Sequence, residues 1–355
     1  QDLLAVYKDT ATFSSDKKTE FKPKLGDSPI YEHHTTSLVF SDPPAHTRVR
    51  RLMAAALTPR HIAAMEAGLE ALVDSLLDKI EAKGDVDLVD DYAGAIPVEI
   101  IGNLLGVPHG QRDSLREWSL LVLGALEPVL TPAQLERASR AIVEMEHYLG
   151  KVIDDRRRNP GDPDTDMLSR LIAGENGEQL EPKELMHNCI FLLNAGHETT
   201  TNLIGNGLVA LQAWPEQKAR LIAEPELIKT AVEEFLRMES SNQLGNRLAT
   251  CDTEIGGVRI PAQSFVTLGI GAANRDPEHF AEPDRMDITR SPNRHLAFGS
   301  GIHQCVGLAL GRLEGRVAIG RFLERFPNYT LLPGVQRGGR ARFRGFLHAP
   351  ASIRP

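Results

Sequence analysis

Apolar residues recur at three- and four-residue spacing along most of the chain, which is the pattern of helices with one buried face. The longest such stretch, residues 182–213, follows a polar turn and ends at Trp214-Pro215, so it predicts one unusually long helix. We expect helices over residues 1–8, 47–57, 63–80, 97–105, 111–126, 133–158, 182–213, 226–238 and 306–326.

The pattern changes after residue 246. Residues 250–261 surround the pair Gly256-Gly257, which indicates a β-hairpin. Residues 274–293 are rich in Pro and Asp and predict an irregular meander. No repeat and no long linker interrupts the sequence. We therefore predict a mainly α protein with a minor β region, in which residues 1–355 form a single domain.

The formal net charge of −8 argues against binding to nucleic acid or to an anionic membrane. The apolar runs are far shorter than the roughly 20 residues needed to cross a bilayer, so we expect no membrane insertion. Cys189, Cys251 and Cys305 are too few and too scattered for a disulfide framework or a zinc site. They fit a protein of the reducing cytoplasm.

Residues 298–307, Phe-Gly-Ser-Gly-Ile-His-Gln-Cys-Val-Gly, carry the strongest chemical signal. Gly299 and Gly301 permit backbone angles closed to other residues and close approach to a flat group. Cys305 stands at the start of an expected helix, where unpaired amides and the helix dipole lower the pKa of a thiol. A thiolate there ligates a metal or acts as a nucleophile. The alternative is a buried structural cysteine beside a glycine turn.

The whole pattern Phe-Gly-x-Gly-x-His-x-Cys-x-Gly resembles the haem-binding loop of the cytochrome P-450 family, and the resemblance covers nearly the whole chain. It implies a fold in which haem b is buried between a long central helix and a Cys-bearing loop. It also implies that Cys305 is the axial thiolate ligand of the iron. The cofactor contacts that the resemblance implies in this loop are Phe298, Gly299, Gly301, His303 and Gly307.

Residues 195–200, Ala-Gly-His-Glu-Thr-Thr, lie in the middle of the long expected helix. Gly and Thr are unfavourable inside a helix, and the Thr199 hydroxyl can bond back to the Ala195 carbonyl and bend it. By resemblance, Ala195 and Gly196 border the groove above the iron where O2 sits. Glu198 and Thr199 then form the acid–alcohol pair that relays protons. The alternative is an ordinary surface or capping cluster.

Glu234 and Arg237 are three residues apart and therefore share a helix face. By resemblance to the family's Glu-x-x-Arg motif, this pair is buried and tied to an Arg of the meander, for which we identify Arg285. The role of the three residues is structural, because they hold the cofactor loop in shape. The alternative for the pair is a routine surface ion pair.

His46 and Arg50 are four residues apart and face one way on their expected helix. A buried haem carries two propionates that need cationic partners. The resemblance implies that His46 and Arg50 supply some of these partners, and Arg247 and His303 the rest. The alternative for any one of them is solvent exposure.

The segment between the Glu-x-x-Arg helix and Arg247 lines the substrate pocket in the family. Here residues 240–246 read Ser-Ser-Asn-Gln-Leu-Gly-Asn, and Ser241 replaces a Pro that the family often has. We expect Asn242, Gln243 and Leu244 in the pocket, with an amide that grips an oxygen or nitrogen group of the substrate. An equally weighted alternative is that these polar groups bond the local backbone.

The resemblance implies a monooxygenase that inserts one oxygen atom of O2 into a small organic substrate. No flavin or iron–sulfur module is recognisable in the sequence, so we expect electrons from a separate ferredoxin and its ferredoxin reductase. The docking cations that the resemblance implies are Arg48, Arg51, Arg312 and Arg316.

Two other functions are open: a peroxide-driven peroxygenase on the same fold, and a non-catalytic haem-binding sensor or carrier. Glu198 and Thr199 argue against both, because neither function needs a proton relay. The family also has more residues before the helix at residues 1–8. We therefore expect the chain to lack its extreme N-terminal segment.

Overall fold

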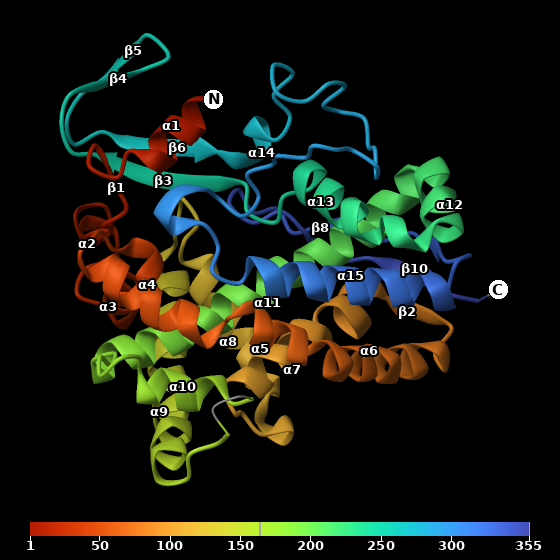
Figure 1. Cartoon of the computed structure of the whole chain (residues 1–355), viewed down its shortest axis with the longest axis horizontal. Coiled ribbons are helices and arrows are strands. Elements are labelled where there is room, and N and C mark those ends of the chain that lie inside the picture. Colours follow the sequence, from red (N-terminus) through yellow and green to blue (C-terminus); the bar gives the residue numbers. More distant parts are fainter. Residues whose placement is uncertain (163–164, 355) are drawn as a thin grey trace.

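The computed structural model describes residues 1–162 and 165–354 and is mainly helical, as predicted (Figure 1). Every helix expected from the periodicity is present, and the ends differ from the expected ones by at most three residues. These helices are α1 (Asp2–Lys8), α4 (Ala45–Ala56), α6 (Glu66–Glu81), α7 (Ala95–Leu104), α8 (Asp113–Gly124), α9 (Pro132–Arg158), α11 (Pro182–Ala213), α13 (Ile228–Met238) and α15 (Leu308–Arg325).

Short helices are the main elements that periodicity missed, because one or two turns are too few to show a repeat. Some had capping signals: Ser28 and Thr58 cap helices that begin on a Pro. The missed helices are α2 (Lys18–Leu25), α3 (Pro29–Thr36), α5 (Pro59–Ala64), α10 (Met167–Ala173), α12 (Pro215–Ala223) and α14 (Ile270–Ala273). Single turns and one π-helical segment are η1 (Leu38–Phe40), η2 (Leu88–Ala93), η3 (His109–Gln111), η4 (Pro225–Leu227) and η5 (Gly301–His303).

Helix α11 runs through the middle of the molecule, with other helices packed around it (Figure 1). Pro182 occupies its first turn, and Glu181 and Glu184 form a capping box. Helices α7, α8, α9, α13 and α15 all contact it, so most of its circumference is buried. This explains why apolar residues occur all around α11 instead of on one stripe.

The β structure is confined to small sheets, as predicted. Strands β1 (Phe13–Ser14), β3 (Leu244–Ala249) and β6 (Phe265–Gly269) form one antiparallel sheet in the order β1-β3-β6. The expected hairpin is formed by β4 (Thr253–Ile255) and β5 (Val258–Ile260). The remaining strands form the sheet β2-β10-β7 and the pair β8-β9: β2 (Asp85–Asp87), β7 (Thr330–Leu331), β8 (Gln336–Arg337), β9 (Phe346–His348) and β10 (Pro350–Ser352).

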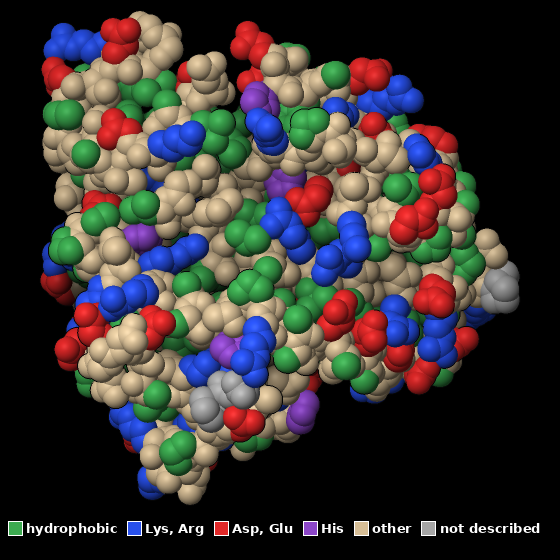
Figure 2. All heavy atoms as spheres, viewed as in Figure 1, with side chains coloured by type: hydrophobic (Ala, Val, Ile, Leu, Met, Phe, Trp, Pro, Cys, Tyr) green, Lys and Arg blue, Asp and Glu red, His purple; other side chains and the backbone are tan. Residues whose placement is uncertain are grey.

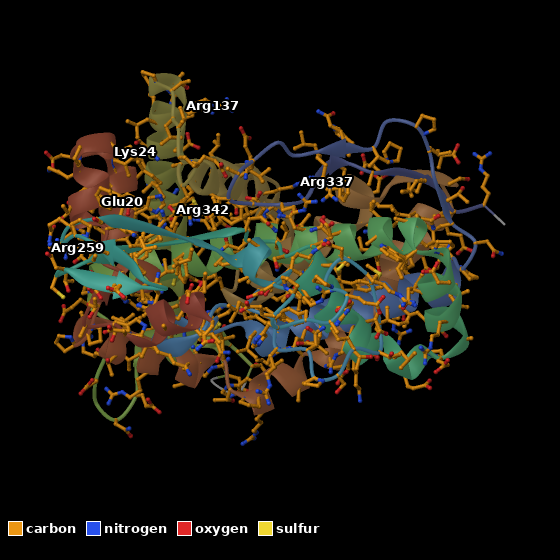
Figure 3. All side chains as sticks on the ribbon, turned by 90° about the horizontal axis from the view of Figure 1, so that it is seen from above. Glu20, Lys24, Arg137, Arg259, Arg337 and Arg342 are labelled. Atoms are coloured by element: carbon orange, nitrogen blue, oxygen red, sulfur yellow. The ribbon has the colours of Figure 1, made fainter. Side chains whose placement is uncertain are left out.

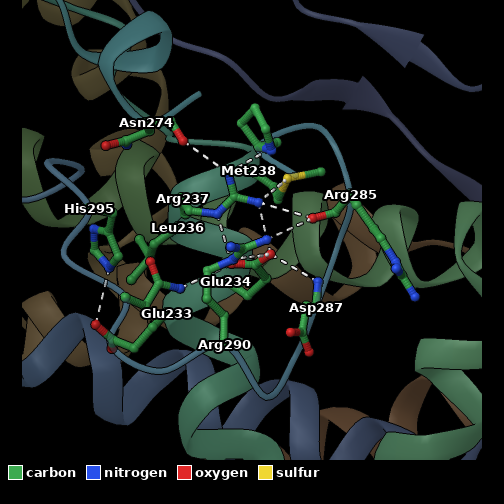
Figure 4. Close-up of polar contacts among 12 residues, drawn as sticks. Glu233, Glu234, Leu236, Arg237, Met238, Asn274, Arg285, Asp287, Arg290 and His295 are labelled. Atoms are coloured by element: carbon green, nitrogen blue, oxygen red, sulfur yellow. Dashed lines mark hydrogen bonds and ion pairs between the residues drawn. The ribbon is translucent and has the colours of Figure 1, made fainter. Parts of the chain in front are cut away.

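Glu234 and Arg237 on α13 form a fully buried ion pair with two hydrogen bonds of 2.8 Å (Figure 4). Such a pair is tolerated only where further hydrogen bonds satisfy both charges. Arg237 donates to the backbone carbonyls of Asn274, Pro283 and Arg285, while Glu234 accepts from Asp287, Arg290 and Asn293. These bonds fasten the meander to α13.

The Arg of the meander that reaches Glu234 is Arg290, so the expectation for Arg285 was wrong. Nε of Arg290 lies 3.3 Å from the Glu234 carboxylate, and the Arg290 side chain is only 12% exposed. The Arg285 side chain points away from the pair and lies in solvent beside Glu282 (Figure 4). Arg285 contributes only its backbone carbonyl, because its position falls on an exposed turn of the meander.

We predict that Glu234→Gln lowers the free energy of unfolding by about 3–5 kcal/mol, because it leaves the Arg237 charge buried without a counterion. Guanidinium titration of purified protein measures this loss. Glu282→Gln is the matched control, since it breaks an exposed pair with Arg285 and is expected to change stability little. Equal losses for the two variants would contradict a special role for the buried pair.

Candidate active site

A cavity of about 350 Å³, counted as the space open to the centre of a water-sized sphere, lies between α11 and the loop before α15. Its wall is mostly apolar, with charged side chains in two regions. The cavity collects most of the residues that the sequence singled out. Those on its wall are Arg50, Ala195, Gly196, Thr199, Asn242, Leu244, Arg247, Phe298, Gly299, His303, Cys305 and Gly307.

The loop that carries Cys305 closes on itself. The backbone N–H of Cys305 donates to the Phe298 carbonyl over 2.9 Å. Gly299 and Gly301 have left-handed φ angles of 66° and 70°, as expected for this loop. A Cβ atom at Gly301 would lie 2.3 Å from the carbonyl oxygen of Tyr7. Gly301 therefore serves the packing of the loop on α1, and its contact with a cofactor stays a prediction.

The thiol of Cys305 faces the cavity but does not have the lowered pKa expected from a helix start. Cys305 is open to the cavity, but the protein around the sulfur still removes enough water to raise its pKa. The Gly307 N–H and the charges of Arg50 and Arg312 act in the opposite direction. The helix begins only at Leu308, so its positive end lies beyond the sulfur atom. A metal cation bound to the sulfur would supply the missing stabilisation of the thiolate.

Salt bridges behind the loop hold Phe298 and Cys305 in place. The Arg312 guanidinium lies 4.7 Å from the centre of the Phe298 ring and donates to Glu233 over 2.7 and 2.8 Å. His295 is the second partner of Glu233, at 3.1 Å. Burial alone would raise the pKa of Glu233, but the hydrogen bonds from His295 and Arg312 lower it to about 2. The Arg312 side chain is thus held by Glu233 and packs on Phe298 of the loop.

Arg50, Arg247 and His303 lie on one part of the cavity wall, with His46 behind His303. The charge of Asp42 acts on His46 and Arg247, but no ion pair joins Asp42 to either of them among the described residues. The rings of His46 and His303 are 4.1 Å apart, and burial lowers the pKa of His303 to about 3. Both ring nitrogens of His46 and Nε2 of His303 have no hydrogen-bond partner among the described residues. Among the described residues, Arg247 donates a hydrogen bond only to the carbonyl of the adjacent residue Asn246, at 2.8 Å. Arg50 lies beside them on the wall.

These unsatisfied donors and uncompensated charges fit a group with two negative charges. Buried donors without acceptors cost free energy, as do buried cations without counterions. The two propionates of a haem would supply both. The residues present therefore fit the cofactor that the sequence resemblance implied.

Helix α11 carries the expected distortion beside the cavity. Oγ1 of Thr199 donates to the Ala195 carbonyl over 2.6 Å, as predicted. The Thr199 carbonyl accepts a hydrogen bond of 2.8 Å from Oγ of Ser241 outside the helix. A Cβ atom at Gly196 would lie 2.6 Å from Cδ1 of Ile101, so glycine also lets α7 approach α11 closely.

Glu198 lies beside Thr199 in sequence but does not line the cavity. Both oxygens of its carboxylate bind Nη1 of Arg340, at 2.6 and 2.7 Å. Burial raises the pKa of Glu198, while the charge and hydrogen bonds of Arg340 oppose that rise. Arg340 is 27% exposed, so the pair connects the interior near Thr199 with the surface.

The polar residues after α13 were expected either to face the substrate pocket or to bond the local backbone, and the structure shows both arrangements. The side chains of Ser240 and Gln243 donate to the carbonyls of Leu236 and Ser240, which favours the local-backbone interpretation for these two residues. The Gln243 amide is held by the local backbone, which Ser241 leaves without the rigidity of a Pro. Asn242 lines the cavity, and its buried Oδ1 has no partner in the described part of the chain.

Several cavity residues were missed from the sequence. Glu314 on α15 is buried against Thr200, and burial raises its pKa to about 8. Lys17, His34 and Arg342 line the opposite side. They belong to segments without a recognisable motif, where alternating Arg residues (340, 342, 344) were the one available signal.

Comparison with known proteins places the chain in one family. Residues 3–338 match the sequence model of the family Cytochrome P450. Cytochrome P450 107B1 of Saccharopolyspora erythraea is 40% identical over 319 residues, which are 89% of this chain and 74% of that protein. Vitamin D(3) 25-hydroxylase of Pseudonocardia autotrophica is 42% identical over 304 residues, 85% of this chain and 73% of that protein.

The fold agrees with solved structures of the same family. P450BioI, solved in complex with acyl carrier protein that carries hexadec-9Z-enoic acid, superposes with a TM-score of 0.93. It is 36% identical, and the match covers 99% of this chain and 90% of that one. Among the described residues, no helix is long and apolar enough to cross a membrane. The chain therefore belongs to the cytochrome P450 family, and it is a haem-containing monooxygenase that acts on organic substrates.

Proposed function

We propose that Cys305 would hold haem b through its sulfur as a thiolate, and that the protein is a monooxygenase that inserts one oxygen atom of O2 into a small organic substrate. The observation that carries this proposal is the shared cavity: Cys305, the basic wall and the groove of α11 all face it. Iron protoporphyrin IX with a thiolate ligand supplies the chemistry of O–O cleavage when bound.

The protein contributes by holding the cofactor. His46, Arg50, Arg247 and His303 would bind its propionates. The ring nitrogens of His46 and Nε2 of His303 have no partner among the described residues, and Arg50 and Arg247 line the cavity beside them. The rigid loop from Phe298 to Gly307 presents the sulfur from one side. Ala195 and Gly196, which have minimal side chains, leave room on the other side for O2 and substrate.

Proton delivery falls to Thr199 and Glu198. The Thr199 hydroxyl gives its hydrogen to the Ala195 carbonyl, which leaves its oxygen free to accept a hydrogen bond on the cavity side. Burial raises the pKa of Glu198, which favours its taking up a proton, while the charge and hydrogen bond of Arg340 oppose that rise. Arg340 positions Glu198 and links it to solvent.

We further propose that electrons come from a separate ferredoxin and its ferredoxin reductase. Figure 2 shows Lys and Arg side chains, interspersed with acidic ones, on the face that carries α15. Ion pairs within the chain already hold Arg48 to Glu184, Arg51 to Glu178 and Arg312 to Glu233. Arg316 has no ion pair with any described residue, so it is the better docking cation of the expected four. The cytoplasm as location is supported by three free cysteines.

Substrate binding is assigned to the apolar part of the cavity. Asn242 is the amide placed to bind a polar group there, since its Oδ1 is buried, lines the wall and lacks a donor in the described structure. Leu244 supplies apolar contact beside it.

We predict that the ferrous carbon monoxide complex absorbs at about 450 nm, because thiolate donation lowers the transition energy. Cys305→His should abolish this band while haem is retained. Cys251→His is the matched control, since Cys251 lies exposed in the β4–β5 region, and it should keep the band. A wild-type band only at about 420 nm in folded protein would contradict the ligand assignment.

We predict that Thr199→Ala uncouples NADH consumption from product formation and releases peroxide, with haem content unchanged. The physical reason is the loss of the hydroxyl that positions a proton in the cavity. Thr201→Ala is the matched control: Thr201 makes the same bond to the carbonyl four residues earlier, at 3.0 Å, and does not line the cavity. Equal coupling in wild type and Thr199→Ala would remove Thr199 from the mechanism.

We predict that Arg316→Glu slows reduction by ferredoxin several-fold, while reduction by dithionite is unchanged. Charge reversal weakens the steering of an acidic partner, and the difference should shrink as salt is added. Arg259→Glu on the distant β4–β5 hairpin is the control and should have no effect (Figure 3). Product formation as fast with peroxide alone as with ferredoxin and NADH would favour the peroxygenase, and no product from either would favour a sensor or carrier.

A further inference from the structure

A second group of charged side chains lies on the side of the cavity formed by α2, β3 and the segment before β9. Lys17 and Arg342 line the cavity there together with Glu20. Lys24 lies near Glu20 and Arg342 (Figure 3), and the charges of Lys24 and Glu127 act on this group. Three cations therefore face two carboxylates, which leaves one positive charge in excess.

Arg342 is the residue of this group with donors to spare. Its Nε donates to the Leu126 carbonyl over 3.1 Å, Nη1 to the Leu244 carbonyl over 2.9 Å, and Nη2 to Oδ1 of Asn246 over 2.5 Å. All three acceptors are neutral. A guanidinium has five N–H groups, and in the described part of the chain the other two have no acceptor. Arg342 therefore has a positive charge and two N–H groups available to a ligand in the cavity that it lines.

Lys17 adds a second cation to the same place. Only 2% of this residue is exposed, and its ammonium group binds one carboxylate oxygen of Glu20 at 2.7 Å. Burial lowers the pKa of Lys17, and the charge of Arg342 lowers it further. The carboxylate of Glu127 accepts the backbone N–H groups of Ala341 and Arg342, so it is already engaged.

His34 is a further buried side chain on the cavity wall, near the charges of Arg342 and Lys24. Burial lowers its pKa to about 3, and the charges of Arg342 and Lys24 contribute to that fall. The imidazole is 3% exposed, lines the cavity, and its Nε2 has no partner among described atoms. A neutral imidazole can still donate one hydrogen bond to an anion without adding to the repulsion between cations.

Apolar side chains cover the cavity between this charged group and α11. Phe21, Phe40, Leu126, Leu244 and Phe343 belong to this part of the wall. A ligand that satisfies both regions has an apolar body and one negatively charged, planar end.

We propose that Arg342, assisted by Lys17, is the subsite that binds the carboxylate of the substrate, and that the enzyme oxidises apolar monocarboxylic acids at a carbon remote from the carboxylate. The inference rests on the proposed role of this cavity as the substrate pocket. The Glu198–Arg340 pair is neutral as a unit and does not cancel the excess charge. Asn246 lies between this group and the basic wall, because its side chain accepts from Arg342 and its carbonyl accepts from Arg247. The charge of Arg247 also acts on Lys17, and Arg247 is the cation assigned above to the haem propionates.

The test uses haem-loaded enzyme and straight-chain carboxylates from octanoate to hexadecanoate, each with its methyl ester. Binding is measured by calorimetry and by the spin-state change of the haem. Wild type should bind the best carboxylate at least about tenfold more tightly than its ester, because charge-assisted hydrogen bonds are the strong ones. Arg342→Gln should remove this preference and leave ester affinity and haem content unchanged, and Arg342→Lys should restore part of it.

Two further variants separate recognition from damage to the fold. Arg337→Gln is the matched control. Arg337 precedes Arg342 in the same segment and pairs with Glu239 outside the cavity (Figure 3). It should keep the full preference for carboxylates. Glu20→Gln removes the carboxylate that competes for Lys17 and should strengthen carboxylate binding several-fold, a gain that a misfolded protein cannot show.

Equal affinity of wild type for acids and esters would overturn the proposal, as would binding of neither. Loss of haem from Arg342→Gln would overturn it too, because Arg342 would then belong to the cofactor. None of these outcomes changes the carbon monoxide band of the wild type. Failure of the anion subsite is therefore distinguishable from failure of the haem-thiolate assignment.

Discussion

The buried ion pair between Glu234 and Arg237 is the interaction on which the position of the cysteine depends. Neither side chain is exposed, so each charge must be satisfied inside the protein. The acceptors and donors that do this come from the meander, from Asn274 to Asn293. The meander leads directly into the cysteine loop. A helix near the core therefore determines where an irregular segment of the chain runs.

A second link from the same helix reaches the loop itself. Glu233 is adjacent to Glu234 and binds His295 and Arg312, and Arg312 covers the ring of Phe298. The loop is thus held at its start and from α15 behind it. The thiol of Cys305 gains its position from this framework, but its protonation depends on what binds to it, since burial raises its pKa.

The cavity wall combines apolar surface with positive charge that lacks a protein counterion. Around His303 and Arg247 this charge matches the propionates of the cofactor, and around Arg342 it matches an acidic substrate. Buried charge of this kind lowers stability, so its presence on a cavity wall indicates a ligand. Glu198 differs, because Arg340 already neutralises it within the chain.

Long elements and local motifs could be predicted from the sequence. The limits of α11 followed from Pro182 and Trp214-Pro215, and the bond from Thr199 to Ala195 followed from helix spacing alone. Contacts between distant segments could not be predicted. Arg285 and Arg290 both lie in the meander, and the sequence does not distinguish which of them reaches Glu234. The path of the meander brings Arg290 to Glu234.

The partners of Glu198 and Gln243 show the same limit. Arg340 lies 142 positions from Glu198 in sequence, and no periodicity links them. Gln243 could face either the cavity or its own backbone, and the turn after α13 decides for the backbone. The cluster of Lys17, His34 and Arg342 joins segments from both ends of the chain, so it becomes visible only in three dimensions.

The central claim is that the loop held by α13 presents Cys305 to the iron as a thiolate. Resonance Raman spectroscopy of the ferric, haem-loaded protein tests it most directly, with cysteine sulfur labelled by a heavy isotope. The account predicts an iron–sulfur stretching band that shifts to lower frequency on labelling and is lost in Cys305→His. A spectrum without any isotope-sensitive band, in protein that retains its haem, would contradict it.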